Sequence, residues 1–170
     1  MNLARQQTAL LSLLKSGHFS DGEADPYIDL VAGSEHLVML RQVILAWRFY
    51  DVQLHCPLTA ALLKKRGTFE ETVKAFAATP NLSAFPDQLA EAFLRRMSIQ
   101  RDPFVAAVAK FELYMTKVKL GDGGEYTIDW PADPRVILRG LTQQTKLTAS
   151  KSYRMRISRR YPGLAQVTAA

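Results

Sequence analysis

The chain has 170 residues, of which 48% are hydrophobic and 22% are charged, a composition typical of a folded globular protein that excludes a wholly disordered one. No apolar run approaches the roughly 18 residues that a membrane-spanning helix needs. The N-terminal segment also lacks the apolar core of a secretory signal, so the expected location is the cytoplasm. The net charge of +6 is uneven: residues 1–133 carry 14 Lys/Arg and 16 Asp/Glu, whereas residues 134–170 carry 8 Lys/Arg and no acid.

The first part of the chain shows the apolar spacing of amphipathic helices. Residues 3–15 predict a first helix, and residues 17–33, which hold three glycines and four acids, are expected to form an exposed loop. Ser34 is a candidate N-cap for a long helix that ends near His55. Along this helix apolar residues recur at helical spacing, namely Leu37, Leu40, Val43, Ile44, Trp47 and Leu54.

Proline, glycine and capping residues divide the next segment into shorter helices. Pro57 interrupts the long helix, and Gly67 stops the helix that follows. Thr68 and Glu71 have the spacing of a capping box, in which each side chain satisfies a free backbone amide at a helix start. An Asp-Pro pair at residues 102–103 predicts another helix start. Further helices are expected at residues 58–65, 87–97 and 104–120, with a loop between residues 80 and 86.

The periodicity changes after residue 120. Residues 121–124 are a glycine-rich turn, and residues 125–130 predict a short strand. A second Asp-Pro pair, at residues 133–134, opens a short helix. Residues 153–157 alternate between apolar and polar side chains, which is the pattern of a half-buried strand.

These elements predict a mainly α fold. We expect a helical bundle domain at residues 1–120, followed by a small strand-helix-strand domain at residues 121–170. This α/β piece would resemble a winged helix or a peptide-recognition element. The sequence contains no Walker loop and no glycine motif for dinucleotides, so nucleotide chemistry is not expected.

The residues that most often perform chemistry are few and poorly spaced for it. His18, His36 and His55 are the only histidines, and none is set in a metal-binding signature. Cys56, the single cysteine, follows His55, but adjacent helical residues point about 100° apart, which is a poor geometry for a nucleophile and its base. A buried, inert thiol is expected instead. We therefore expect no catalytic residue, no metal site and no cofactor in this chain.

Glu112 stands out because it lies beside Phe111 in an otherwise apolar helix. We expect its carboxylate to pair with an arginine, such as Arg48 or Arg96, and to hold helices in register. A role in proton transfer is the alternative.

The strand at residues 153–157 is the best candidate for binding. Tyr153, Met155 and Ile157 alternate with Arg154 and Arg156, so one face would pack on a core while the other is basic. An edge strand of this kind can accept an extended acidic peptide through main-chain hydrogen bonds. The same positive charges could instead bind the phosphates of a nucleic acid, or form a solvated tail without a partner.

Several short segments, taken in order, resemble a family formerly labelled a DNA-binding domain. Its members are similar to the partner proteins of multinuclear non-heme iron oxidative enzymes in methanobactin and thiaglutamate biosynthesis. The segments that carry the resemblance are Leu3–Gly17 with Arg5-Gln6-Gln7, Arg48-x-Tyr50 with Cys56-Pro57-Leu58, Thr68-Phe69 with Pro80, Phe111-Glu112, Ile128-Asp129-Trp130 with Asp133-Pro134, and Tyr153-Arg154-Met155-Arg156 with Pro162-Gly163.

This resemblance implies a non-catalytic subunit that forms a heterodimer with the iron enzyme through its helical part. The C-terminal sheet would bind the leader of a ribosomally made precursor peptide, and the iron would belong to the partner enzyme, which modifies cysteine. The peptide-binding residues would be Tyr153, Arg154, Met155, Arg156 and Ile157, with Tyr126 and Ile128 on a neighbouring strand. A small nucleic-acid-binding protein that uses its basic C-terminal tail is the alternative.

Overall fold

The computed structural model describes residues 3–16, 25–79, 82–143 and 148–169. Within these ranges it contains eight α-helices, one short 3-10 helix and a three-stranded sheet, which confirms the predicted mainly α fold with a small C-terminal α/β piece. The helices are α1 (Leu3–Ser16), α2 (Pro26–Ala32), α3 (Glu35–His55), α4 (Pro57–Arg66), α5 (Phe69–Ala77), α6 (Pro86–Met97), α7 (Pro103–Lys119) and α8 (Pro134–Thr142), and the strands are β1 (Tyr126–Trp130), β2 (Tyr153–Ile157) and β3 (Ala165–Ala169).

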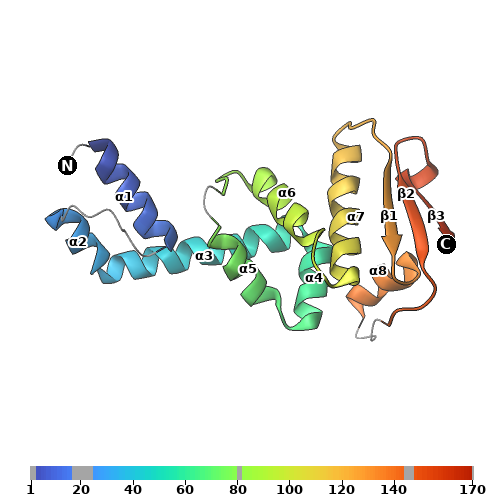
Figure 1. Ribbon diagram of the computed structural model, residues 1–170, viewed down its shortest axis with the longest axis horizontal. Helices are drawn as coiled ribbons and strands as arrows, with labels where there is room; N and C mark the ends of the chain where they lie inside the picture. Colours follow the sequence, from blue (N-terminus) through green and yellow to red (C-terminus); the bar gives the residue numbers. More distant parts are fainter. Residues whose placement is uncertain (1–2, 17–24, 80–81, 144–147, 170) are drawn as a thin grey trace.

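The molecule is elongated, with α1 and α2 at one end and the sheet at the other (Figure 1). The long helix α3 runs from the α1–α2 end to the middle of the molecule, where it packs on α4, α5 and α6. Near its start, Leu37 joins a small cluster with Ala9, Leu13 and Ile28. Near its end, Val52 belongs to the main core. The same helix therefore contributes to two separate groups of buried residues.

Aspartate and serine caps explain where several helices begin. Ser34 accepts a hydrogen bond from the backbone N–H of His36 at the start of α3, and Asp102 accepts one from Phe104 N–H at the start of α7. Asp133 does the same for α8. These side chains satisfy amide groups that have no partner inside the helix, and all three predicted helix starts are confirmed.

Two details of the predicted helix starts are wrong, although α5 does begin directly after Thr68 as predicted. Residues 26–32, which were expected to be part of a loop, form α2; Asp25 caps this helix by accepting a hydrogen bond from Tyr27 N–H at 2.9 Å. The expected capping box at Thr68 is absent, since α5 begins after Thr68 without a side-chain cap. Phe69, the first residue of α5, is buried in the main core.

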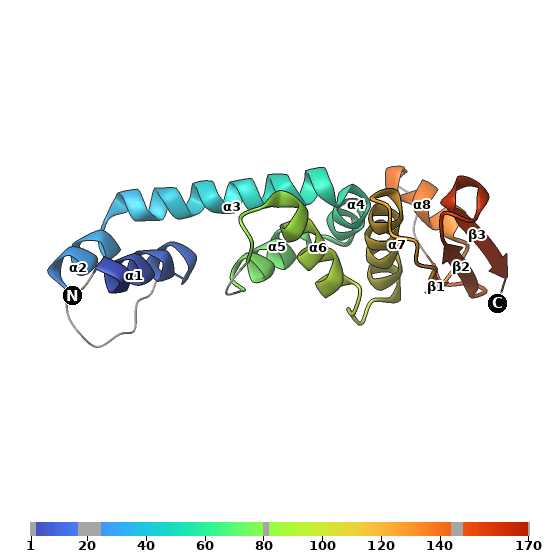
Figure 2. The ribbon, with the colours of Figure 1, turned by 90° about the horizontal axis from the view of Figure 1, so that it is seen from above.

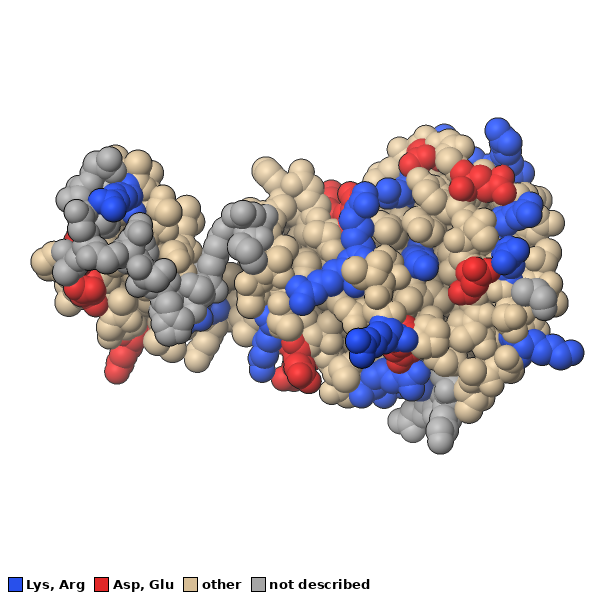
Figure 3. Space-filling model, viewed as in Figure 1, with Lys and Arg blue, Asp and Glu red and all other residues tan. Residues whose placement is uncertain are grey.

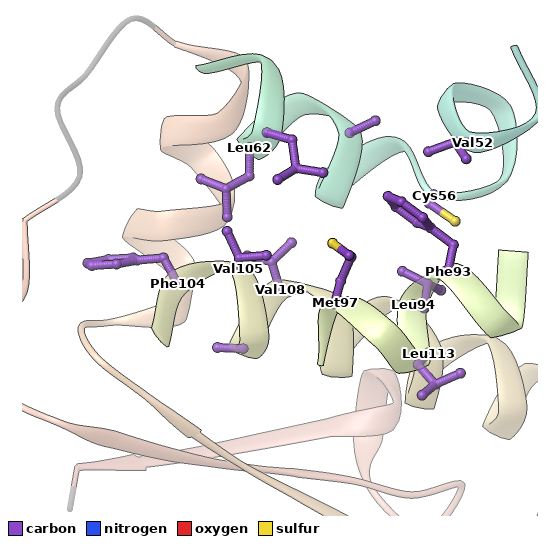
Figure 4. Packing of buried hydrophobic residues seen from close by; sticks show 14 of the residues in the cluster. Val52, Cys56, Leu62, Phe93, Leu94, Met97, Phe104, Val105, Val108 and Leu113 are labelled. Carbon is purple, nitrogen blue, oxygen red and sulfur yellow. The ribbon is translucent and has the colours of Figure 1, made fainter. Parts of the chain in front are cut away.

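The main core lies between the second half of α3, helices α4 to α8 and the sheet. Phe93 and Met97 of α6 and Val108 of α7 are almost completely buried there (Figure 4). The Phe76 ring meets Phe93 edge to face, with ring centroids 5.1 Å apart, an arrangement that aromatic pairs favour. The core includes residues from both sides of residue 120, so the two predicted domains contribute to one hydrophobic core.

The three strands form an antiparallel sheet in the order β1-β2-β3. One face packs on α7, where Tyr114 stacks on Tyr126 at 4.3 Å between centroids and Phe111 contacts Trp130 at 6.0 Å. The two strands predicted from the sequence, β1 and β2, are confirmed. β3 was not predicted; a tight turn that contains the 3-10 helix Pro162–Leu164 brings it back alongside β2.

Candidate peptide-binding sheet edge

The strand register determines which side chains of the sheet face solvent. Because side chains alternate along a strand, paired residues point to the same face. Arg154 pairs with Asp129 of β1 and with Thr168 of β3, and all three are exposed. The adjacent exposed positions are Thr127, Arg156 and Gln166. The solvent face therefore has acidic and hydroxyl groups on β1, arginines on β2 and uncharged polar groups on β3.

The two arginines of β2 are partly neutralised by acids that precede the basic tail. Arg154 Nε lies 2.9 Å from Asp129 Oδ1, and Arg156 Nε lies 3.9 Å from Glu125 Oε1. The side chains of Arg154 and Arg156 stay about half exposed, at 52% and 55%. Figure 3 accordingly shows blue and red side chains interspersed at the sheet end of the molecule, with no continuous basic surface on that face.

The apolar residues predicted to bind peptide lie on the opposite face of the sheet, toward the core. Met155 and Ile157 of β2 and Ile128 of β1 are buried in the core, and Tyr126 and Tyr153 are half-buried beside it. Of the seven residues, the two arginines are thus the ones whose side chains point to solvent, about half exposed and paired with acids. A direct role of any of the seven in peptide binding stays a prediction.

β2 itself cannot add an extended peptide, because it is the central strand. Its main chain is paired with β1 on one side and β3 on the other. Strand addition requires the unpaired N–H and C=O groups of an edge strand. The available edges of this sheet are the outer sides of β1 and β3. An added peptide strand can therefore pair with β1 or β3, one strand away from the predicted position at residues 153–157.

Of the two edges, β3 is the more accessible. β1 is packed on α7, whereas β3 contains no buried residue and, within the described residues, makes substantial contact only with β2. Its sequence, Ala-Gln-Val-Thr-Ala, has no charge and no proline. Natural proteins usually protect an edge strand with lysine, proline, a bulge or a covering element, and none of these protects β3 within the part of the chain that the structure describes.

The turn between β2 and β3 is rich in arginine, and Glu125 also reaches it, where it accepts a hydrogen bond from the Tyr161 hydroxyl at 3.1 Å. Arg159 and Arg160 are exposed in the turn that joins β2 to β3, and Arg156 precedes them at the end of β2. The turn is closed by the hydrogen bond from Ser158 N–H to the Leu164 carbonyl at 3.0 Å. Residues 148–169 contain no acid. A strand that pairs with β3 would therefore lie next to several arginines.

Other residues whose types often perform chemistry, such as cysteine and histidine, have structural surroundings here. Cys56 is fully buried, and burial raises the pKa of its thiol far above the ordinary value. The neighbouring His55 directs its Nδ1 toward Asp87 Oδ1, 3.8 Å away. The prediction of a buried thiol is confirmed.

Glu112 has a different partner from the one expected. Its two carboxylate oxygens accept hydrogen bonds from Leu58 N–H at 2.6 Å and Thr59 N–H at 2.8 Å. Glu112 therefore caps the start of α4 from across the core, and the prediction of an arginine partner is wrong. Burial raises the pKa of this carboxyl, against the opposing effect of the hydrogen bonds.

Comparisons with known proteins give no identification. No family model matches the chain, and neither a curated protein nor a solved structure is significantly similar to it. Within the described residues, no helix has the length and apolarity to cross a membrane, and no three His, Cys, Asp or Glu side chains come together as ligands for a metal ion. The function must be inferred from the geometry of the sheet and from the sequence resemblance.

Proposed function

We propose that this protein is a non-catalytic subunit that binds an extended acidic peptide by adding it as a fourth strand beside β3. The observation that carries the proposal is the unprotected edge of β3. Its outward N–H and C=O groups have no partner among the secondary-structure elements of the described chain. Main-chain pairing supplies affinity without requiring a deep pocket.

The charges beside β3 support a preference for acidic peptides. Arg154 and Arg156 are already paired toward β1, but both remain half exposed, and β3 alone separates their strand from the proposed peptide. Arg159 and Arg160 lie in the adjoining turn. Exposed arginines of this kind orient a charged partner and speed its association more than they tighten the final complex.

The sequence resemblance extends the proposal to a pathway role. The peptide would be the leader of a ribosomally made precursor, and the protein would present that precursor to a multinuclear non-heme iron oxidative enzyme, which holds the iron and modifies cysteine. This extension rests on the short motifs alone. The sheet edge supports peptide binding irrespective of which enzyme receives the peptide.

Proline substitutions in β3 test the mechanism. Neighbouring residues of a strand direct their N–H groups to opposite edges. Of the two variants Gln166→Pro and Val167→Pro, one therefore loses an N–H group that points outward, and the other loses an N–H group that points to β2. The probe is a fluorescein-labelled peptide of alternating glutamate and valine, and binding is measured by fluorescence anisotropy. The outward variant should bind about tenfold more weakly or worse while its thermal unfolding stays like that of the wild type.

Two controls sharpen this experiment. Thr168→Ala changes an exposed side chain of β3 but keeps its main chain, so it should bind the probe like the wild type. A peptide of alternating lysine and valine should bind more weakly than the glutamate peptide. Wild-type affinity in both proline variants would overturn strand addition. Tight binding of a labelled oligonucleotide, with an affinity that falls steeply with salt, would favour the nucleic-acid alternative instead.

A further inference from the structure

The long helix α3 is apolar on two faces, and among the described residues only one of them is packed against other elements. Leu37 and Val52 face the buried clusters. The opposite face carries six exposed residues, called here the α3 stripe: Met39, Leu40, Val43, Trp47, Tyr50 and Leu54. Figure 2 shows α1, α2, α5 and α6 all on one side of α3, which leaves the other side of the helix open along its length. A helix with two apolar faces normally lies between two partners.

The spacing of the stripe suits another helix. Leu40, Val43, Trp47, Tyr50 and Leu54 are separated alternately by three and four residues, which is the repeat that packs helices by inserting side chains of one between those of the other. The seam covers about 21 Å of helix at 1.5 Å per residue. It is thus a continuous surface and not a set of isolated exposed residues.

The area of the stripe is that of an interface. Its members are between 46% and 63% exposed. With roughly 150–250 Å² of surface for each aromatic side chain, and similar or smaller values for the aliphatic ones, the stripe exposes on the order of 600 Å². The largest apolar patch of an ordinary monomer reaches about 300–600 Å². Together with its rim, the stripe approaches the roughly 800 Å² that each partner contributes to a standard interface.

We infer that the α3 stripe is the interface between two copies of this chain, paired antiparallel through α3. A symmetric dimer sets the same patch against itself, and the stripe contains no charge that this pairing would oppose. Trp47 and Tyr50, which contact each other edge to face at 5.9 Å, belong to the residue types that dominate binding energy when they are buried at an interface centre.

Charges at the two ends of the stripe favour the antiparallel orientation. Glu35 lies exposed at the start of α3. Lys64 lies near its end, where its ammonium group donates a hydrogen bond to Gln53. An antiparallel pair brings Glu35 of each copy toward Lys64 of the other, whereas a parallel pair would bring like charges together. The opposed helix dipoles also attract in this orientation.

Sedimentation velocity of the full chain tests this inference. The wild type should sediment as a species of twice the 19.1 kDa chain mass at micromolar concentration. Trp47→Glu should raise the dissociation constant about thirtyfold or more, because it places a carboxylate at the centre of the interface. Ile99→Glu is the matched control, since Ile99 is 82% exposed outside the stripe, and it should remain dimeric.

Other outcomes would overturn the inference. A wild type that is monomeric at high micromolar concentration excludes the dimer. If a different protein then binds the wild type and Trp47→Glu abolishes that binding, the stripe is the binding surface for that partner. A dimer that survives Trp47→Glu uses another surface. For the orientation, a mixture of Leu40→Cys and Leu54→Cys should cross-link between copies, and cross-linking of each variant with itself would contradict the antiparallel pair. Peptide binding at β3 is unaffected by Trp47→Glu, so the two proposals fail separately.

Discussion

Replacement of Glu112 by alanine should destabilise the protein strongly although the residue has no catalytic role. The carboxylate of Glu112 is the acceptor for two backbone N–H groups at the start of α4, Leu58 N–H at 2.6 Å and Thr59 N–H at 2.8 Å. α4 has no capping side chain of its own, since Cys56 at its N-cap makes no such hydrogen bond. Alanine leaves both donors without their partner; the Thr59 donor is buried and the Leu58 donor is partly buried.

The size of the effect follows from those two donors. A buried donor left unsatisfied costs about 1–3 kcal/mol, so the gross loss for two donors is about 2–6 kcal/mol. Alanine also removes a carboxylate whose burial is itself unfavourable, which offsets part of that loss. A net decrease of about 3 kcal/mol in the free energy of unfolding is expected. For a chain of this size, this corresponds to a melting temperature lower by about 6–12 °C.

Urea unfolding followed by circular dichroism at 222 nm measures this difference. Glu112→Gln keeps one acceptor oxygen and should lose about half as much as alanine. Glu91→Ala is the matched control: Glu91 forms an exposed ion pair with Arg95 at 2.7 Å, and such pairs contribute less than about 1 kcal/mol. A Glu112→Ala protein within about 0.5 kcal/mol of the wild type would refute the capping role.

Three further predictions concern titration, reactivity and backbone conformation. Burial raises the pKa of Glu112 above its ordinary 4.5, so the folded state holds this proton more tightly than the unfolded chain. The contribution of Glu112 to stability should therefore fall as pH rises from 4.5 through the raised pKa. In Glu112→Gln, the free energy of unfolding should depend less on pH over that range. The buried Cys56 thiol should react with a disulfide reagent only in proportion to unfolding by urea, so rapid labelling of the native protein would contradict its burial. Gly67 ends α4 with a φ of 71°, so Gly67→Ala should cost about 1–2 kcal/mol, whereas Gly123→Ala, with open space and no positive φ, should cost less in the same urea titration.

Local signals in the sequence predicted most helix starts, and the main omission had the same signal. The Asp-Pro pairs at residues 102–103 and 133–134 were recognised, and both aspartates cap the helices that follow. The pair at residues 25–26 does the same for α2. The surrounding segment is rich in glycine and acid, which favours a loop, and α2 is a helix of only seven residues. Capping chemistry was the more reliable evidence here than local composition.

The features that could not be predicted from the sequence depend on the long-range arrangement of the chain. β3 has two small alanines at its ends and a single β-branched apolar residue, Val167, so its alternation is weak. The order β1-β2-β3 depends on pairing between β1 and β2 residues that lie 23 to 31 positions apart in the sequence, and no local pattern indicates which strand is central. Likewise, α3 has two apolar faces, and periodicity alone does not indicate which one packs on the body. The candidate site therefore had to move from β2 to the edge of β3.

Hydrogen exchange of the β3 amides, measured by NMR in the full chain with and without a saturating glutamate-valine peptide, tests strand addition most directly. If the peptide pairs with β3, the outward N–H groups of alternate residues between Ala165 and Ala169 should become protected from exchange. The amides of β1 should keep their exchange rates. Peptide binding without new protection in β3, or with protection confined to β1, would contradict the proposal that this edge recognises the peptide.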